Sequence, residues 1–275
     1  MRLCLCNEVL RPFDFARQCT FAAELGYDAL EVAPFTLATE PHRLPPGEVA
    51  ALRRSAQGAG IAVSGLHWLL LTPPGLSLTT PDPQVRAKTR EVLSGLVQLC
   101  ADLGGRYLVL GSPAQRRLEP RREAEGRARA MELLAETAAG AEEAGVIVCL
   151  EPLAPVETDF VNTVAEAAEI VHAIGSPALR TMVDCRAAAL AEAEPVPELL
   201  RRWLPTGLVA HVHLNDRSGL APGQGEDRFG PVLAVLRELD YAGDLGIEPF
   251  TYRPDGPGAA AFAAGYLRGL SEMLS

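Results

Sequence analysis

Short apolar runs alternate along the chain with longer stretches that are rich in Ala, Leu, Glu and Arg. Each apolar run has four to six residues, the length of a buried strand, and the stretches between the runs are long enough for helices. Strands that alternate with helices indicate βαβ units and a parallel sheet. Eight such runs predict an α/β protein with a (β/α)8 TIM barrel, and an open doubly wound sheet is the alternative. The expected strands cover residues 3–7, 29–33, 62–67, 107–111, 146–151, 181–184, 208–213 and 244–248.

Glycines mark the expected ends of several helices, shortly before a strand begins. Glycine adopts the left-handed backbone conformation after a helix more easily than other residues do. The loops after strands are long and rich in Pro and Gly, as in barrels that build a pocket at the carboxyl ends of their strands. No linker or low-complexity segment divides the chain, so we expect one domain over residues 1–275. The glycines in question are Gly26, Gly60, Gly104, Gly145 and Gly243.

The composition narrows the classes of function. The chain has 275 residues, of which 48% are hydrophobic, and can therefore bury a large core. It contains no run that approaches the roughly 20 apolar residues of a membrane span, and its first residues lack the layout of a secretory signal. A net charge of −10 argues against a nucleic-acid surface, which needs a basic stripe. We expect a cytoplasmic protein with no membrane or nucleic-acid partner, whose six cysteines are reduced and buried.

Four of the expected strands end in a side chain of a type that binds metal ions, namely Glu151, Asp184, His213 and Glu248. The carboxyl ends of barrel strands meet at one mouth of the barrel, so these side chains should converge. Each of them alone has a simpler interpretation, such as a turn cap, a salt bridge to Arg186 or a structural histidine. Together they would place three carboxylates close to one another, which is costly without a cation. Three carboxylates and one imidazole form a hard ligand set that suits Mn²⁺ or Mg²⁺.

The sequence around these residues resembles the xylose-isomerase-like TIM barrels, a superfamily of sugar isomerases, ketose 3-epimerases and endonuclease IV. The resemblance covers essentially the whole chain. It implies that the same four residues hold one divalent ion, with Mn²⁺ as the first candidate and Mg²⁺, Co²⁺ or Zn²⁺ as alternatives. It also implies a homo-oligomer, since the resembling epimerases are usually dimers or tetramers. The segments that carry it are Leu-Glu151-Pro, Val-Asp184, His211-Val-His213-Leu-Asn-Asp216-Arg217 and Ile-Glu248-Pro-Phe250.

Two further positions match residues that contact the substrate in the resembling family, and one position departs from it. Glu157 and Arg217 are the implied substrate contacts, although Arg217 is two residues closer to His213 than the family pattern requires. Ala187 stands where the family often has a histidine that contacts the sugar. This departure weakens the likeness to well-studied ketohexose epimerases. It counts more strongly against endonuclease IV, whose three-zinc site needs additional His and Asp ligands.

The expected ligands also indicate a reaction. A divalent ion bound by the neighbouring carbonyl and hydroxyl oxygens of a sugar polarises the carbonyl and stabilises an enediolate. One carboxylate then removes the proton alpha to the carbonyl, and a second returns a proton from the opposite face. We assign these roles to Glu151 and Glu248, and predict a metal-dependent isomerase or epimerase for a small ketose or related sugar. The alternatives are an inosose-dehydratase-like lyase, a non-catalytic sugar- or metal-binding barrel and, disfavoured, DNA repair.

Other residues near the strand ends allow more than one interpretation. His67 and Trp68 follow the third strand and are expected at the barrel mouth as substrate contacts, although Trp68 fits packing against a helix equally well. Glu31 fits either a pocket wall or an interior salt bridge. We expect His211 to face away from His213 and to serve packing, or to support the site from behind.

The remaining basic residues of interest are one lysine and two arginines. Lys88 is the only lysine and lies at the start of an expected helix, which argues against Schiff-base chemistry. Arg116 and Arg117 follow the fourth strand. They fit a site for a substrate hydroxyl or phosphate, and they fit a solvated surface loop equally well.

Overall fold

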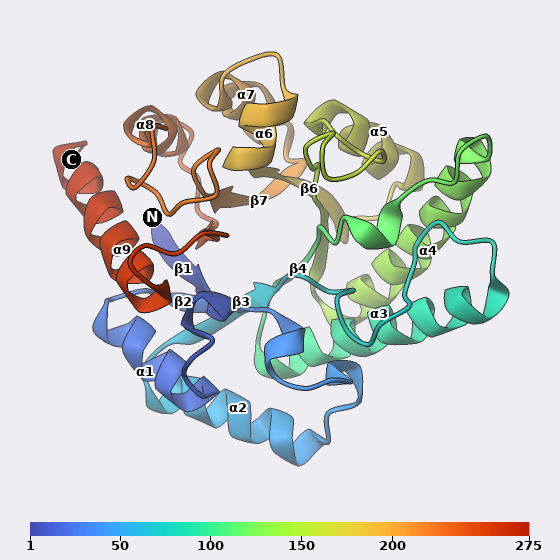
Figure 1. Ribbon diagram of the computed structural model, residues 1–275, viewed down its shortest axis with the longest axis horizontal. Coiled ribbons are helices and arrows are strands. Elements are labelled where there is room, and N and C mark those ends of the chain that lie inside the picture. The colour runs from blue at the N-terminus through green and yellow to red at the C-terminus, as the bar shows by residue number, and fades with distance from the viewer. Residues whose placement is uncertain (275) are drawn as a thin grey trace.

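The computed structural model describes residues 1–274 and contains a closed barrel of eight parallel strands (Figure 1). Each strand pairs with the next along the chain, and β8 pairs with β1 to close the barrel. The predicted (β/α)8 TIM barrel is therefore confirmed, and each expected strand lies within two residues of its observed bounds. The strands are β1 (Arg2–Cys6), β2 (Ala29–Val32), β3 (Ala62–Leu66), β4 (Tyr107–Leu110), β5 (Ile147–Leu150), β6 (Leu179–Asp184), β7 (Val209–Leu214) and β8 (Asp244–Ile247).

Helices surround the barrel on its outside (Figure 1). Within residues 1–274, one α-helix follows each strand, except that two follow β6. The extended residue Pro195 immediately precedes the second of these. Over residues 1–274 the α-helices are α1 (Phe15–Glu24), α2 (Pro46–Gly58), α3 (Pro83–Leu103), α4 (Glu123–Ala144), α5 (Val164–Ile174), α6 (Cys185–Ala191), α7 (Val196–Trp203), α8 (Gly230–Glu238) and α9 (Gly256–Met273). Short 3-10 helices cover Asn7–Leu10, Pro34–Thr36, Pro41–Arg43, Ala114–Arg116 and Leu204–Thr206.

The glycines expected to end helices behave as predicted in four of five cases. Gly26, Gly60, Gly104 and Gly145 have φ angles between +72° and +85°. The prediction for Gly243 is wrong, because Asp240 adopts the left-handed conformation after α8, with φ of +49°. Gly243 instead leaves room for a neighbouring tyrosine ring, which a side chain at this position would overlap.

Alternation along the strands divides the buried side chains into two layers. Outward-facing residues such as Leu30, Leu66 and Val212 belong to the large apolar core that packs against the helices. A separate small apolar cluster consists of Tyr107, Val109, Cys149 and Met182. Buried charged and polar groups share its side of the strands: Glu31, Glu151, Asp184, His211, His213 and Glu248 are all at most 6% exposed.

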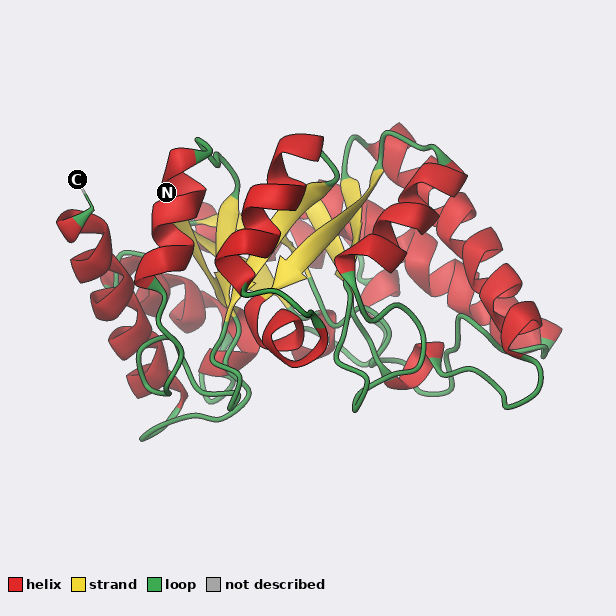
Figure 2. Ribbon diagram, turned by 90° about the horizontal axis from the view of Figure 1, so that it is seen from above, coloured by secondary structure: helices red, strands yellow, loops and turns green. Residues whose placement is uncertain are grey.

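The longer loops leave the carboxyl ends of the strands and gather on one side of the barrel (Figure 2). They include the segments 67–82, 151–163 and 215–229. These loops enclose the strand ends at which the four candidate ligands lie. Among the helices described, none has the length and apolar character needed to cross a membrane.

All six cysteines are free and buried, as predicted. Burial raises the pKa of each thiol above its usual value, and for Cys19 and Cys100 the pKa rises to about 12. These thiols therefore stay protonated at neutral pH and serve packing rather than nucleophilic chemistry.

Candidate metal centre

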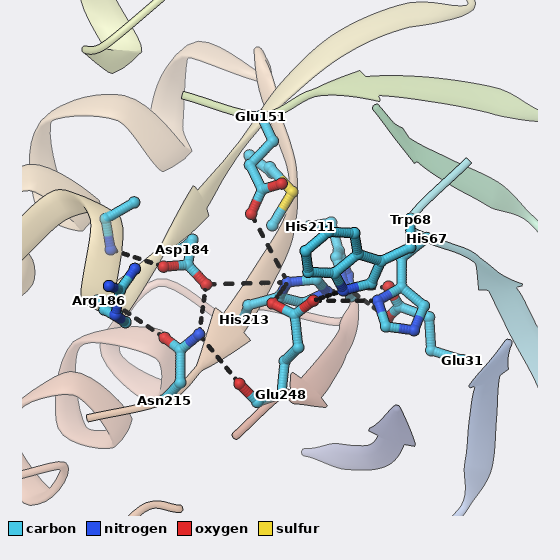
Figure 3. A network of polar contacts seen from close by, with 12 residues as sticks. Glu31, His67, Trp68, Glu151, Asp184, Arg186, His211, His213, Asn215 and Glu248 are labelled. Atoms are coloured by element: carbon cyan, nitrogen blue, oxygen red, sulfur yellow. Dashed lines mark hydrogen bonds and ion pairs between the residues drawn. The ribbon is translucent and has the colours of Figure 1, made fainter. Parts of the chain in front are cut away.

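Four side chains from consecutive strands converge at the carboxyl mouth of the barrel (Figure 3). Glu151 follows β5, Asp184 ends β6, His213 lies in β7 and Glu248 follows β8. One ligand atom of each lies within 4.8 Å of a ligand atom of every other. The structure thus brings together the four residues that were selected from the sequence.

The His213 ring shows which of its atoms faces the cluster. Its Nδ1 lies 3.1 Å from Glu248 Oε2, 3.9 Å from Glu151 Oε1 and 3.9 Å from Asp184 Oδ2. This Nδ1 is buried and has no hydrogen-bond partner among residues 1–274. Buried polar atoms are normally hydrogen-bonded. A buried nitrogen that has no such bond and faces three carboxylates is therefore suited to bind a cation together with them.

Glu31 fixes the other side of the same ring. His213 Nε2 lies 2.9 Å from Glu31 Oε1, and His211 Nε2 lies 2.9 Å from Glu31 Oε2. A proton on His213 Nε2 that is donated to Glu31 leaves the Nδ1 lone pair directed at the three carboxylates. Of the two interpretations of Glu31, the structure favours the interior position, since its buried carboxylate pairs with both imidazoles. The Tyr107 hydroxyl also donates to Glu31 Oε2 at 2.8 Å.

The expectation that His211 points away from His213 is wrong. Side chains two positions apart on a strand share a face, so both rings enter the barrel interior. Their ring centroids are 4.8 Å apart, and Tyr107 stacks on His211 at a centroid distance of 4.1 Å. His211 therefore supports the centre from beneath through Glu31.

The three carboxylates have electrostatic environments that call for a positive charge. Burial, followed by the charges of Glu248 and Asp184, raises the pKa of Glu151 well above its usual value. Burial and the charge of Glu248 raise the pKa of Asp184 to about 6. For Glu248 the burial effect is outweighed by His213 and His67, which lower its pKa to about 2. A bound divalent cation would relieve this repulsion and keep all three groups ionised.

Asn215 joins two of the candidate ligands and was not singled out from the sequence. Its Nδ2 donates to Asp184 Oδ2 at 2.7 Å and to the Glu248 backbone carbonyl at 3.2 Å. Asp184 Oδ1 accepts a hydrogen bond from the backbone N–H of Ala187 at 2.6 Å, and so caps helix α6. Position 187 thus orients Asp184 through its backbone. Asn215 lies in the segment from His211 to Arg217 that carries the family resemblance, but it was given no role there.

His67 and Trp68 both contact Glu248. His67 is 1% exposed, with Nδ1 3.1 Å from Glu248 Oε1 and Nε2 2.9 Å from Glu8 Oε2. Trp68 donates from Nε1 to Glu248 Oε1 at 3.0 Å, and its φ is +52°, a conformation that costs a side-chain-bearing residue about 1–3 kcal/mol. His67 and Trp68 thus both bind Oε1 of Glu248, whereas Oε2 faces His213 in the cluster.

Two arginines expected near the site form ion pairs with acidic residues. Arg217 is exposed and pairs with Asp227 at 2.6 Å, so its predicted contact with a substrate stays a prediction. Arg186 takes the position at the mouth, where its Nη1 lies 2.6 Å from Glu157 Oε1 and its guanidinium lies over the ring of Phe250 at 5.3 Å. Arg186 lies two residues after Asp184, and the sequence suggested only a salt bridge between these two. Its contact with Glu157 was not predicted.

Arg116 also differs from the surface position that was one of its two interpretations. It is 1% exposed, and its Nη1 donates to the Glu151 backbone carbonyl at 2.7 Å. Arg117 is exposed and donates to the Glu157 backbone carbonyl at 3.1 Å. Both arginines therefore brace the chain that carries Glu151 and Glu157.

Two glycines make room for the cluster. A side chain at Gly111 would overlap the carboxylate of Glu151, and one at Gly246 would collide with the ring of His213 and crowd Glu31. Beside the cluster lies a space of about 40 Å³, whose walls include Glu151, Glu157, Glu248, Trp68 and Phe250. Glu157 thus faces the same space as the two glutamates assigned to proton transfer.

The fold and the cluster define a (β/α)8 barrel with three buried carboxylates and a histidine at the carboxyl ends of its strands. A model of the family described as "Xylose isomerase-like TIM barrel" matches residues 19–270. The chain belongs to this family, which confirms the resemblance inferred from its sequence.

Its relatives are epimerases of ketoses. The chain is 27% identical over 232 residues to a D-psicose 3-epimerase of Agrobacterium fabrum, which covers 83% of this chain and 76% of the relative. It is 29% identical over 232 residues to an L-ribulose 3-epimerase of Mesorhizobium japonicum, covering 83% of this chain and 73% of the relative. Epimerases are isomerases, so the predicted enzyme class is confirmed at the level of these relatives.

A solved structure agrees in fold. The crystal structure of a D-psicose 3-epimerase in the presence of D-fructose superposes with a TM-score of 0.84 at 21% identity, over 98% of this chain and 99% of that one. The likeness extends over the complete barrel, including the strands that carry the four converging residues.

Proposed function

We propose that this protein is a metal-dependent epimerase that moves a proton at the carbon alpha to the carbonyl of a small ketose or related sugar. The observation that supports this most directly is the buried Nδ1 of His213, which faces three carboxylates and has no hydrogen-bond partner within the part of the chain that the structure describes. The relatives named as ketose 3-epimerases support the sugar class.

The proposed ligands are Glu151, Asp184, His213 and Glu248. This set of three carboxylates and one imidazole favours Mn²⁺, with Mg²⁺, Co²⁺ and Zn²⁺ as alternatives. When bound, a divalent ion acts as a Lewis acid on the carbonyl and makes the neighbouring C–H more acidic.

Glu151 and Glu248 are the proposed acid and base. They follow different strands, β5 and β8, and both line the space beside the cluster. One carboxylate removes the proton and the other returns a proton to the opposite face of the same carbon. His67 and Trp68 hold Glu248 Oε1 and thereby position this side chain for the transfer.

Glu157 and Arg186 are the proposed contacts for substrate hydroxyl groups. Their ion pair lies at the mouth of the space, and each group retains capacity for further hydrogen bonds. Arg186 takes the role that the sequence assigned to Arg217, because Arg217 pairs with Asp227 elsewhere.

The test is proton NMR of the Mg²⁺-loaded protein in D₂O with a panel of ketoses and aldoses, beside a Glu248→Gln variant. Loss of the signal alpha to the carbonyl, appearance of an epimer and a silent variant would support the proposal. Absence of exchange in every sugar would refute it. A product that has lost a hydroxyl group would point instead to a lyase.

A further inference from the structure

A second, larger cleft lies beside the candidate centre, on its Trp68 side. It has a volume of about 580 Å³, within the range of cavities that bind small organic ligands. Its walls come from the loops after β1, β2, β3 and β8, and carry the aromatic rings of Phe35, Trp68, Phe250 and Tyr252. These loops lie on the carboxyl side of the barrel, the same side as the four candidate metal ligands.

The cleft adjoins the space beside the cluster. Trp68 and Phe250 line both, and their rings meet edge to face at a centroid distance of 6.4 Å, so these two rings form the boundary between the two spaces. The space next to Glu151 and Glu248 measures only about 40 Å³. A group attached to a sugar whose reacting carbons lie at the cluster would have to pass these two rings to reach the larger cleft.

The charged groups of the cleft are already engaged. Glu8 Oε2 is 2.9 Å from His67 Nε2, and the guanidinium of Arg11 lies over the ring of Phe35 at 5.6 Å. One acid and one base leave no net charge to attract an ion. Phe250 and Tyr252 are 43% and 37% exposed and turn apolar surface toward the opening. Such walls suit an uncharged apolar group better than the hydroxyl groups of a free sugar.

We propose that the substrate is a ketose that carries an uncharged aromatic or alkyl substituent at the end remote from its reacting carbons. The sugar end reacts at the cluster, and the substituent occupies the cleft among Phe35, Trp68, Phe250 and Tyr252. This inference rests on the proposed epimerase function and specifies the substrate class for the same site. Stacking on several aromatic faces gives a substituted sugar the advantage over a bare one.

The experiment compares three substrates in the NMR exchange assay: a free ketohexose, the same sugar as a phenylmethyl ether at its terminal hydroxyl, and its terminal phosphate. We expect kcat/KM for the ether to exceed that for the free sugar by about tenfold or more, the scale of added apolar contacts in a pocket. Equal values for the ether and the free sugar, or a preference for the phosphate, would overturn the inference while leaving the epimerase function in place. No exchange with any of the three would refute the proposed function itself.

A variant connects the preference to the cleft. Phe35→Ala should reduce kcat/KM for the ether about tenfold more than for the free sugar, because only the substituent reaches this ring. Phe262→Ala is the matched control, since Phe262 lies on α9 outside the cleft and is 48% exposed. It should preserve both rates. An equal loss for the two substrates in Phe35→Ala would contradict the assignment of the cleft.

Discussion

The two faces of the barrel strands bury very different side chains. On β2, Leu30 packs outward into the apolar layer beneath the helices, whereas the adjacent Glu31 points inward to two histidines. Both residues are 0% exposed. The outer layer contributes burial of apolar surface. The inner layer buries charged groups, which cost stability unless they are paired.

This difference assigns separate tasks to the two layers. The outer layer stabilises the barrel, and the inner layer orients the His213 ring and the three carboxylates around it. Substitutions in the outer layer should therefore lower the free energy of unfolding with little effect on metal affinity. Substitutions in the inner layer should change metal affinity or activity.

Glu151→Gln should lower epimerase activity by about 10²- to 10⁴-fold, the usual effect of losing a general acid or base. The metal-free protein should not lose stability, because the raised pKa of Glu151 shows that its charge is disfavoured by burial, Glu248 and Asp184. Solvent exchange in D₂O and urea unfolding in chelator measure the two effects. The exposed Glu119→Gln is the control. A marked loss of stability would mean that Glu151 has a structural role that its environment does not indicate.

Glu31→Gln should weaken metal affinity by about 10- to 100-fold, as loss of the partner of a ligating histidine does. Removal of one member of a buried ionic cluster should also cost about 3–5 kcal/mol of unfolding free energy. Calorimetric metal titration and urea unfolding provide the measurements. Unchanged metal affinity would show that His213 is oriented without Glu31.

Leu30→Ala is the matched change on the outer face of the same strand. It should cost about 2–5 kcal/mol of unfolding free energy, because it leaves a cavity in the apolar layer. The metal affinity of the folded protein should stay within about twofold of the original, since the ring of His213 retains its partners. If affinity falls as far as in Glu31→Gln, the two layers are not separable.

Arg186→Gln should raise KM by about tenfold or more, since hydrogen bonds to charged groups contribute about 1.5–3 kcal/mol. Arg217→Gln should leave KM unchanged, because Arg217 pairs with Asp227 outside the cluster. Steady-state kinetics with the preferred sugar compares the two. The reverse result would mean that the loop after β7 brings Arg217 to the substrate on binding.

Most of the fold could be predicted from the chain because alternation and helix stops are local properties. The four converging residues were also predictable, since each ends a strand whose position follows from its apolar run. Asn215, Glu8 and Arg186 were not, because their contacts depend on how loops from different strands meet. The common direction of His211 and His213 was predictable, because residues two positions apart on a strand point to the same face. The prediction that His211 faces away from His213 overlooked this spacing.

The buried thiols have a practical consequence. All six cysteines are buried, and every thiol has a raised pKa. The folded protein should therefore remain unlabelled by maleimides at neutral pH. A single cysteine introduced at Tyr252 would be the one reactive position, and a fluorophore attached there would report directly on what enters the aromatic cleft.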